Sequence, residues 1–147
     1  MRLRALQQTL ALRLMLWSLL SIAVGVLLQK TALPFWRAFG QQTAGWGAID
    51  GAIALAGWRG GTQPPPPPVQ ELPELRKLRA LLWGNAGLDL LYIAVGLFLW
   101  RQAGPARRGH GAAVVLQALF LAIFDWAHAR ATAQLEKQCK DLHDHNP

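Results

Sequence analysis

The chain has 147 residues, of which 52% are hydrophobic and only 16% charged, and its formal net charge is +7. This composition is too apolar for an ordinary soluble basic domain, and the fifteen Lys and Arg border apolar segments instead of gathering in one run, which argues against a nucleic-acid partner. The single cysteine, Cys139, excludes an internal disulfide, a CxxC pair and a cysteine-based zinc site.

Four segments are apolar enough, and close enough to the roughly 20 residues that a bilayer requires, to be candidate membrane spans. We therefore expect an all-α protein, a bundle of four transmembrane helices at about 13–29, 41–59, 80–100 and 109–129. These spans form one membrane domain over residues 1–130, and residues 131–147 are expected to form a cytoplasmic tail. The lipid bilayer is accordingly the first expected partner.

The first two spans need separate arguments. The N-terminal segment has the basic start of a signal peptide, but it lacks small residues at the usual cleavage spacing, so we expect it to remain as a span. The second span is the weakest because it contains Gln41, Gln42 and Asp50, and we expect the other helices to shield it from lipid. Pro34 suits a first helical position and is expected to begin this helix.

Five consecutive prolines, Pro64 to Pro68, lie between the second and third spans. Such a run forms an extended spacer, and we prefer this interpretation to a ligand for aromatic grooves because no partner-defining flanks accompany it. Pro73 is expected to restart the helix, with Glu74 in its first turn.

The distribution of positive charge predicts the orientation. Ten of the fifteen Lys and Arg lie in the N-terminal segment, the Pro-rich loop with its flanks, and the tail, whereas five lie in the other two connections. Because cytoplasmic loops of membrane proteins carry the excess of positive charge, both termini are expected to be cytoplasmic.

Each of the last three spans carries an acid, and polar residues share its helical stripe. Counted at about 1.5 Å per residue from the cytoplasmic ends, Asp50 and Asp89 come out roughly 13 Å deep. Because ionisable side chains are costly in lipid, we expect these stripes to face one another. The predicted polar cluster consists of Asp50, Asn85, Asp89, Tyr92, Gln117, Asp125 and His128.

No Lys or Arg lies at the level of Asp50 and Asp89, so at least one of them is expected to hold a proton, or a cation or water to lie between them. Asp125 is shallower, and three partners are open to it. It could pair with His128, Arg130 or Arg13.

Small residues predict close helix packing. Gly47 and Gly51 form a GxxxG pair, Ala118 and Ala122 have the same spacing, and Gly87 is a further packing candidate. Such pairs serve packing inside one chain at least as often as they join two copies.

Three blocks, PFWRAFGQQTAGWGAIDGAIAL, LLWGNAGLDLLYIAVGLFL and GHGAAVVLQALFLAIFD, resemble an uncharacterised family of small bacterial four-span membrane proteins. The resemblance covers most of residues 34–126 and implies a multi-pass protein of the bacterial inner membrane, without implying an activity. In that family, position 50 is occupied by Asn or Asp, which favours a hydrogen-bonding role over an obligatory charge. The matching positions are Trp46, Gly47, Asp50, Asn85, Gly87, Leu88, Asp89, Tyr92, Gly109, His110, Gly111, Gln117, Phe124 and Asp125.

Three classes of function follow, in this order. The first is a structural or assembly subunit in which the polar residues hold helices together, with a second copy or another membrane protein as partner. The second is binding or translocation of a cation, a proton or a small amphipathic ligand at the polar cluster. The third is a lipid-active enzyme that uses Asp89 or Asp125, with His128 nearby. HExxH, GxSxG and phosphate-binding glycine motifs are absent, and the sequence indicates neither a metal nor a cofactor.

Overall fold

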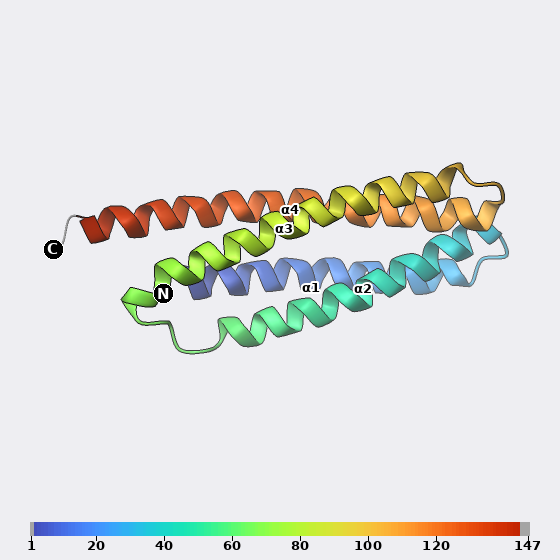
Figure 1. Cartoon of the computed structure of the whole chain (residues 1–147). Helices are drawn as coiled ribbons and strands as arrows, with labels where there is room; N and C mark the ends of the chain where they lie inside the picture. The colour runs from blue at the N-terminus through green and yellow to red at the C-terminus, as the bar shows by residue number, and fades with distance from the viewer. Residues whose placement is uncertain (1, 145–147) are drawn as a thin grey trace.

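The computed structural model describes residues 2–144, and within this range it leaves out the side chains of Pro68 and of residues 142–144. The described residues form four helices and no strand, which confirms the all-α prediction. Each helix runs antiparallel to the next, so α1 begins and α4 ends at the same end of the bundle as the Pro-rich loop (Figure 1). The helices are α1 (Arg2–Gln29), α2 (Pro34–Gly61), α3 (Pro68–Arg101) and α4 (Pro105–Asp144).

Proline and glycine set the helix boundaries. As predicted, α2 begins at Pro34, and α4 begins at Pro105 directly after Gly104, whose φ of +100° favours glycine. The prediction that Pro73 restarts the third helix is wrong, because α3 already begins at Pro68 and Pro73 lies inside it. Near a helix start, the missing N–H of Pro73 costs only the bond to the carbonyl of the exposed Val69, which the helix tolerates.

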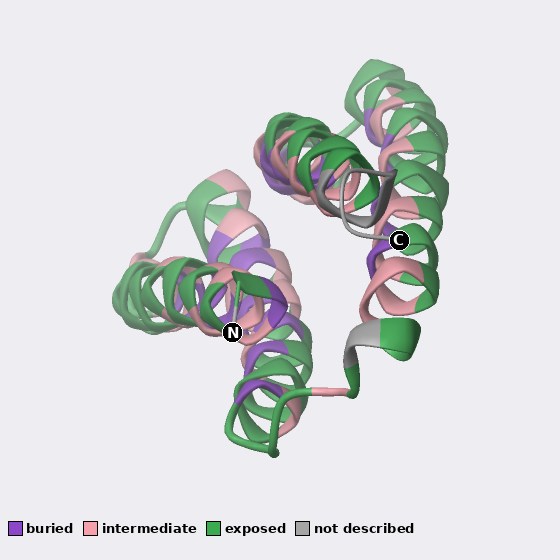
Figure 2. Cartoon of the chain, turned by 90° about the vertical axis from the view of Figure 1, so that its left-hand side faces the viewer, coloured by how far each residue is buried: buried purple, intermediate pink, exposed green. Residues whose placement is uncertain are grey.

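The bundle consists of two helical hairpins. α1 packs along α2, α3 packs along α4, and the hairpins meet mainly through α2 and α4, whereas α1 and α4 touch only briefly. Figure 2, an end-on view, shows the buried residues on the faces that the helices turn toward one another, with exposed residues on the outside. Helices α2 and α3 barely touch, which leaves the two hairpins open along one side.

Small residues allow the helices of each hairpin to approach closely. A Cβ atom on Gly25 of α1 would lie 2.6 Å from the backbone nitrogen of Ala44 in α2, and one on Gly96 of α3 would lie 3.0 Å from the carbonyl oxygen of Gly111 in α4. Each hairpin therefore contains a backbone contact that only glycine permits.

The predicted packing glycines differ in their surroundings. Gly47 and Gly51 both face Ser18 of α1, and the Ser18 hydroxyl donates a 2.7 Å hydrogen bond to the carbonyl oxygen of Gly47. The GxxxG pair thus lies against another helix of the same chain. Gly87 is exposed and has open space around it, so no helix packs there, contrary to the packing expected for it.

The segment expected as a cytoplasmic tail continues α4 as far as Asp144, while residues 145–147 lie outside the described residues. This extension packs beside the start of α3. Glu136 forms ion pairs with Arg76 at 3.1 Å and with Arg79 at 2.8 Å, and Arg2 of α1 donates a 3.0 Å hydrogen bond to the side chain of Gln138. The polar ends of three helices thus form a charged extension beyond the apolar part of the bundle.

Replacing Glu136 with Gln is expected to lower the free energy of unfolding by about 1 kcal/mol, because the Arg76 and Arg79 side chains are 58% and 40% exposed, so that solvent screens both pairs even though Glu136 itself is only 14% exposed. Thermal unfolding in detergent at low and high ionic strength measures the effect. The difference from the unsubstituted protein should become smaller at about 1 M salt. A larger loss that persists at high salt would contradict this assignment.

Candidate functional site

A cavity of about 530 Å³ lies between the two hairpins, and all four helices contribute to its lining. Five of the seven residues predicted for the polar cluster line this one cavity: Asp50, Asn85, Asp89, Tyr92 and Asp125. They come from three helices, since Asp50 lies on α2 and Asp125 on α4, while the other three share one stripe of α3.

The acidic side chains of the cavity are almost completely buried. Asp50 is 2% exposed, Asp89 is 4% exposed, and the Oδ2 atom of each has no hydrogen-bond partner among the described residues. The indole Nε1 of Trp46, which also lines the cavity, is a buried donor without a partner in the same part of the chain. Asp125 is 7% exposed and lies within electrostatic range of both other acids. Buried polar atoms are usually paired, so the cavity offers unused acceptors and one unused donor.

The walls of the cavity are apolar. Leu10 and Leu14 of α1 and Leu82 of α3 line it on the inside, and the rings of Trp46 and Tyr92 meet edge to face with centroids 5.1 Å apart. Four lining residues on α2 and α3 are more than half exposed: Ile49, Ile53, Leu81 and Leu88. The cavity therefore opens sideways between α2 and α3, past an apolar rim.

The lining also limits the chemistry. The described lining residues include three carboxyl groups but no Lys, Arg or His to balance them, and no Ser, Thr or Cys that could act as a nucleophile. No group of three His, Cys, Asp or Glu side chains within the described part of the chain could hold a metal ion. The site is suited to binding a positively charged or proton-donating group, because its unpaired oxygens accept hydrogen bonds.

Gln117 and His128 do not reach the cavity, although we expected them in the same cluster. At about 100° per residue, Gln117 and His128 lie within about 20° of one another around α4, whereas Asp125 is about 60° to 80° away from both. Gln117 therefore faces α1, where its side chain accepts a 2.8 Å hydrogen bond from Trp17 Nε1 and donates a 3.1 Å bond to the Ser21 hydroxyl. The prediction that Gln117 and His128 share a cavity-facing stripe with Asp125 is therefore wrong.

The three partners considered for Asp125 are engaged elsewhere. His128 contacts the carbonyl oxygen of Phe124 through Nδ1 at 2.7 Å, and its Nε2 lies 3.4 Å from Nη1 of Arg13. Arg130 lies over the ring of Trp126, 4.8 Å from its centroid. Sequence reasoning missed the apolar groove around Arg13 and Trp17, although their spacing of four residues on one helix places both side chains on one face.

These features define an all-α, four-helix protein in which three helices, α1, α3 and α4, are long and apolar enough to cross a membrane. Residues 13–126 match a family of unknown function, DUF6992, and the chain belongs to this family. The predicted membership of an uncharacterised family is thereby confirmed. No curated protein and no solved structure matches the chain.

Proposed function

We propose that the chain is a four-span protein of the bacterial inner membrane with cytoplasmic termini, in which α2 is the fourth, partly shielded span. Large apolar side chains are exposed on all four helices, which favours contact with lipid over contact with water. Half-exposed tryptophans support the two interfaces, with Trp58 and Trp126 toward the Pro-rich end and Trp36 and Trp100 toward the other. The excess of Lys and Arg at the Pro-rich end supports the orientation.

Within this membrane domain, the function that we propose is binding of a small amphipathic cation, such as a long-chain amine, in the cavity between the hairpins. The observation that carries the proposal is the pair of buried, unpartnered carboxyl oxygens on Asp50 and Asp89 in a cavity without a basic residue. An ammonium group would supply both the missing hydrogen bonds and the missing positive charge. The apolar walls would hold its hydrocarbon part.

The sideways opening supports a ligand that arrives from the lipid phase. The half-exposed Ile53 and Leu81 at the rim present an apolar path to the acids, which a hydrated inorganic ion would cross only at a high cost in free energy. An amphipathic molecule can instead keep its chain at this rim while its charged end reaches Asp89.

A purely structural role for the acids has less support. Among the described residues, the hydrogen bonds that join different helices within the apolar part of the bundle include those of Ser18, Trp17 and Gln117 and the contact of Arg13 with His128, and each of these lies between α1 and a neighbouring helix. The unpartnered oxygens of Asp50 and Asp89 add no such bond between α2 and α3. Helix packing alone leaves these two buried oxygens without a role, which supports binding over a purely structural function.

Ligand-induced stabilisation in mild detergent tests the proposal with n-decylammonium as the probe and n-decanol as its neutral match. At about 100 times its dissociation constant, the amine is expected to raise the unfolding midpoint by about 5 °C or more. Asp89→Asn, which keeps size and hydrogen-bonding capacity, is expected to weaken binding about tenfold or more. Asp50→Asn should weaken it less, since the resemblance admits Asn at that position.

Glu74→Gln provides the matched control, because it removes a partly exposed carboxylate of α3 that pairs with Lys77 and lies outside the cavity. It should bind the amine as the unsubstituted protein does. Equal stabilisation by decanol and decylammonium, or an undiminished amine effect in a doubly substituted Asp50→Asn/Asp89→Asn protein that retains its fold, would refute the proposal.

A further inference from the structure

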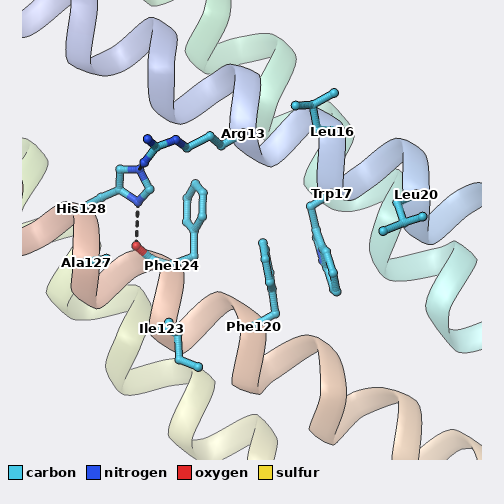
Figure 3. A pocket seen from close by; sticks show the side chains of 9 residues that line it. All are labelled: Arg13, Leu16, Trp17, Leu20, Phe120, Ile123, Phe124, Ala127 and His128. Atoms are coloured by element: carbon cyan, nitrogen blue, oxygen red, sulfur yellow. Dashed lines mark hydrogen bonds between the residues drawn. The ribbon is translucent and has the colours of Figure 1, made fainter.

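A second concave site lies on the opposite side of the contact between α1 and α4. This groove has a volume of about 520 Å³, and Phe124 lines both it and the acidic cavity. Figure 3 shows its side chains, which come from both helices. The groove is lined by Arg13, Leu16, Trp17, Leu20, Phe120, Ile123, Phe124, Ala127 and His128.

One end of the groove is basic. His128 Nδ1 lies 2.7 Å from the carbonyl oxygen of Phe124, and because a carbonyl can only accept, Nδ1 carries the hydrogen (Figure 3). In the neutral ring, Nε2 then accepts from Nη1 of Arg13 at 3.4 Å. The imidazole therefore orients the guanidinium at the groove end, and this contact uses only one of the five N–H donors of Arg13.

The rest of the groove is apolar and firmly built. The rings of Trp17 and Phe120 stack with centroids 3.7 Å apart and an interplanar angle of 9°, and the hydrogen bond of Trp17 to Gln117 fixes the indole. Leu20 and Ile123 are more than half exposed along the edges. From Arg13 to Leu20 the groove follows α1 for about 10 Å, which suits an extended hydrocarbon chain.

We propose that this groove binds one anionic phospholipid, whose phosphate contacts Arg13 and whose acyl chain lies along Leu16, Leu20 and the Trp17–Phe120 stack. Arg forms strong, charge-assisted hydrogen bonds with phosphate, and no Asp or Glu among the lining residues competes for it. Basic side chains at the cytoplasmic interface attract anionic lipids. With the cytoplasmic termini proposed above, the lipid would belong to the cytoplasmic leaflet. The groove and its lipid do not depend on the proposed amine binding.

A second copy of the chain fits this groove less well. Pairing two such faces symmetrically would bring together two Arg13 side chains and two sets of exposed leucines, without an acid on either face to compensate the charge. The basic end favours an anionic occupant, and the apolar length favours a lipid over a free anion.

Native mass spectrometry tests the proposal after reconstitution in equal amounts of phosphatidylglycerol and phosphatidylcholine with identical acyl chains. The unsubstituted protein is expected to retain one phosphatidylglycerol in preference to phosphatidylcholine. Arg13→Gln should reduce that preference about tenfold, since a charged hydrogen bond is lost. Leu20→Trp, which fills the apolar part, should reduce retention of either lipid.

Arg59→Gln is the control, because it removes one positive charge from the same end of the bundle but from outside the groove. Its lipid preference should stay unchanged. The proposal is overturned if Arg13→Gln and Arg59→Gln retain lipid equally, if inorganic phosphate at the same concentration displaces the phosphatidylglycerol, or if a lipid-free dimer is the species observed.

Discussion

Replacing Gly111 with leucine is expected to abolish the native packing of α3 against α4. A Cβ atom at this position would collide with the backbone nitrogen of Trp100 and would lie 2.6 Å from the carbonyl oxygen of Gly96. Backbone atoms of a helix cannot move aside as a flexible side chain can, so the two helices must separate. We expect a loss of about 3 kcal/mol or more, at the upper end of the range for overpacked cores.

The same substitution at Gly87 is the control, since this residue lies on α3 with open space around it. Gly87→Leu should leave the free energy of unfolding unchanged within about 1 kcal/mol, because it adds only helix propensity and exposed apolar surface. Unfolding in mixed detergents, followed by tryptophan fluorescence, compares the two. Equal stability of Gly111→Leu and Gly87→Leu would show that α3 and α4 do not approach each other as described.

Single cysteines in the connections are expected to react with a membrane-impermeant maleimide in an all-or-none pattern. The exposed Ala103, between α3 and α4, should be labelled in intact cells when it is replaced by Cys. Gln63, exposed in the Pro-rich loop, should be labelled as Cys only after permeabilisation. This pattern follows from the proposed cytoplasmic side of the termini, because the two connections lie at opposite ends of the bundle.

The native thiol must first be removed by Cys139→Ala. Cys139 is only partly exposed, and burial raises the pKa of its thiol, so it reacts slowly. Its slow labelling would add a background signal to that of the introduced cysteines. Ala32→Cys, in the connection between α1 and α2, provides a second reporter on the side of Ala103. Labelling of Gln63→Cys in intact cells, or protection of both other sites there, would contradict the proposed topology.

The number of helices and the start of α2 could be predicted because their causes are local. Long apolar runs form helices, and Pro34 marks where the second helix begins. The start of α3 was missed for a local reason as well, because a proline near a helix start is tolerated and Pro73 therefore gives no firm boundary.

The candidate site was predictable only in part. Depth along a helix follows from counting residues, which is why acids on three helices could be expected at comparable levels. The direction in which a side chain points around its helix axis matters only in relation to the neighbouring helices. The packing of α1 against α2 and of α3 against α4 could not be derived from the sequence pattern. Gln117 therefore faces Ser21 of α1 while Asp125 faces the cavity, a difference that only the tertiary contacts establish.

The partnership of α1 and α2 has a consequence for how the protein is made. α2 is not among the described helices that are long and apolar enough to cross a membrane, and its Gly40 and Gly47 are covered by α1. Under the four-span topology proposed above, α1 and α2 would therefore enter the membrane as a paired hairpin and not one after the other. Such insertion would require α1 to remain at the translocation site until the following 32 residues, through Gly61, have been synthesised.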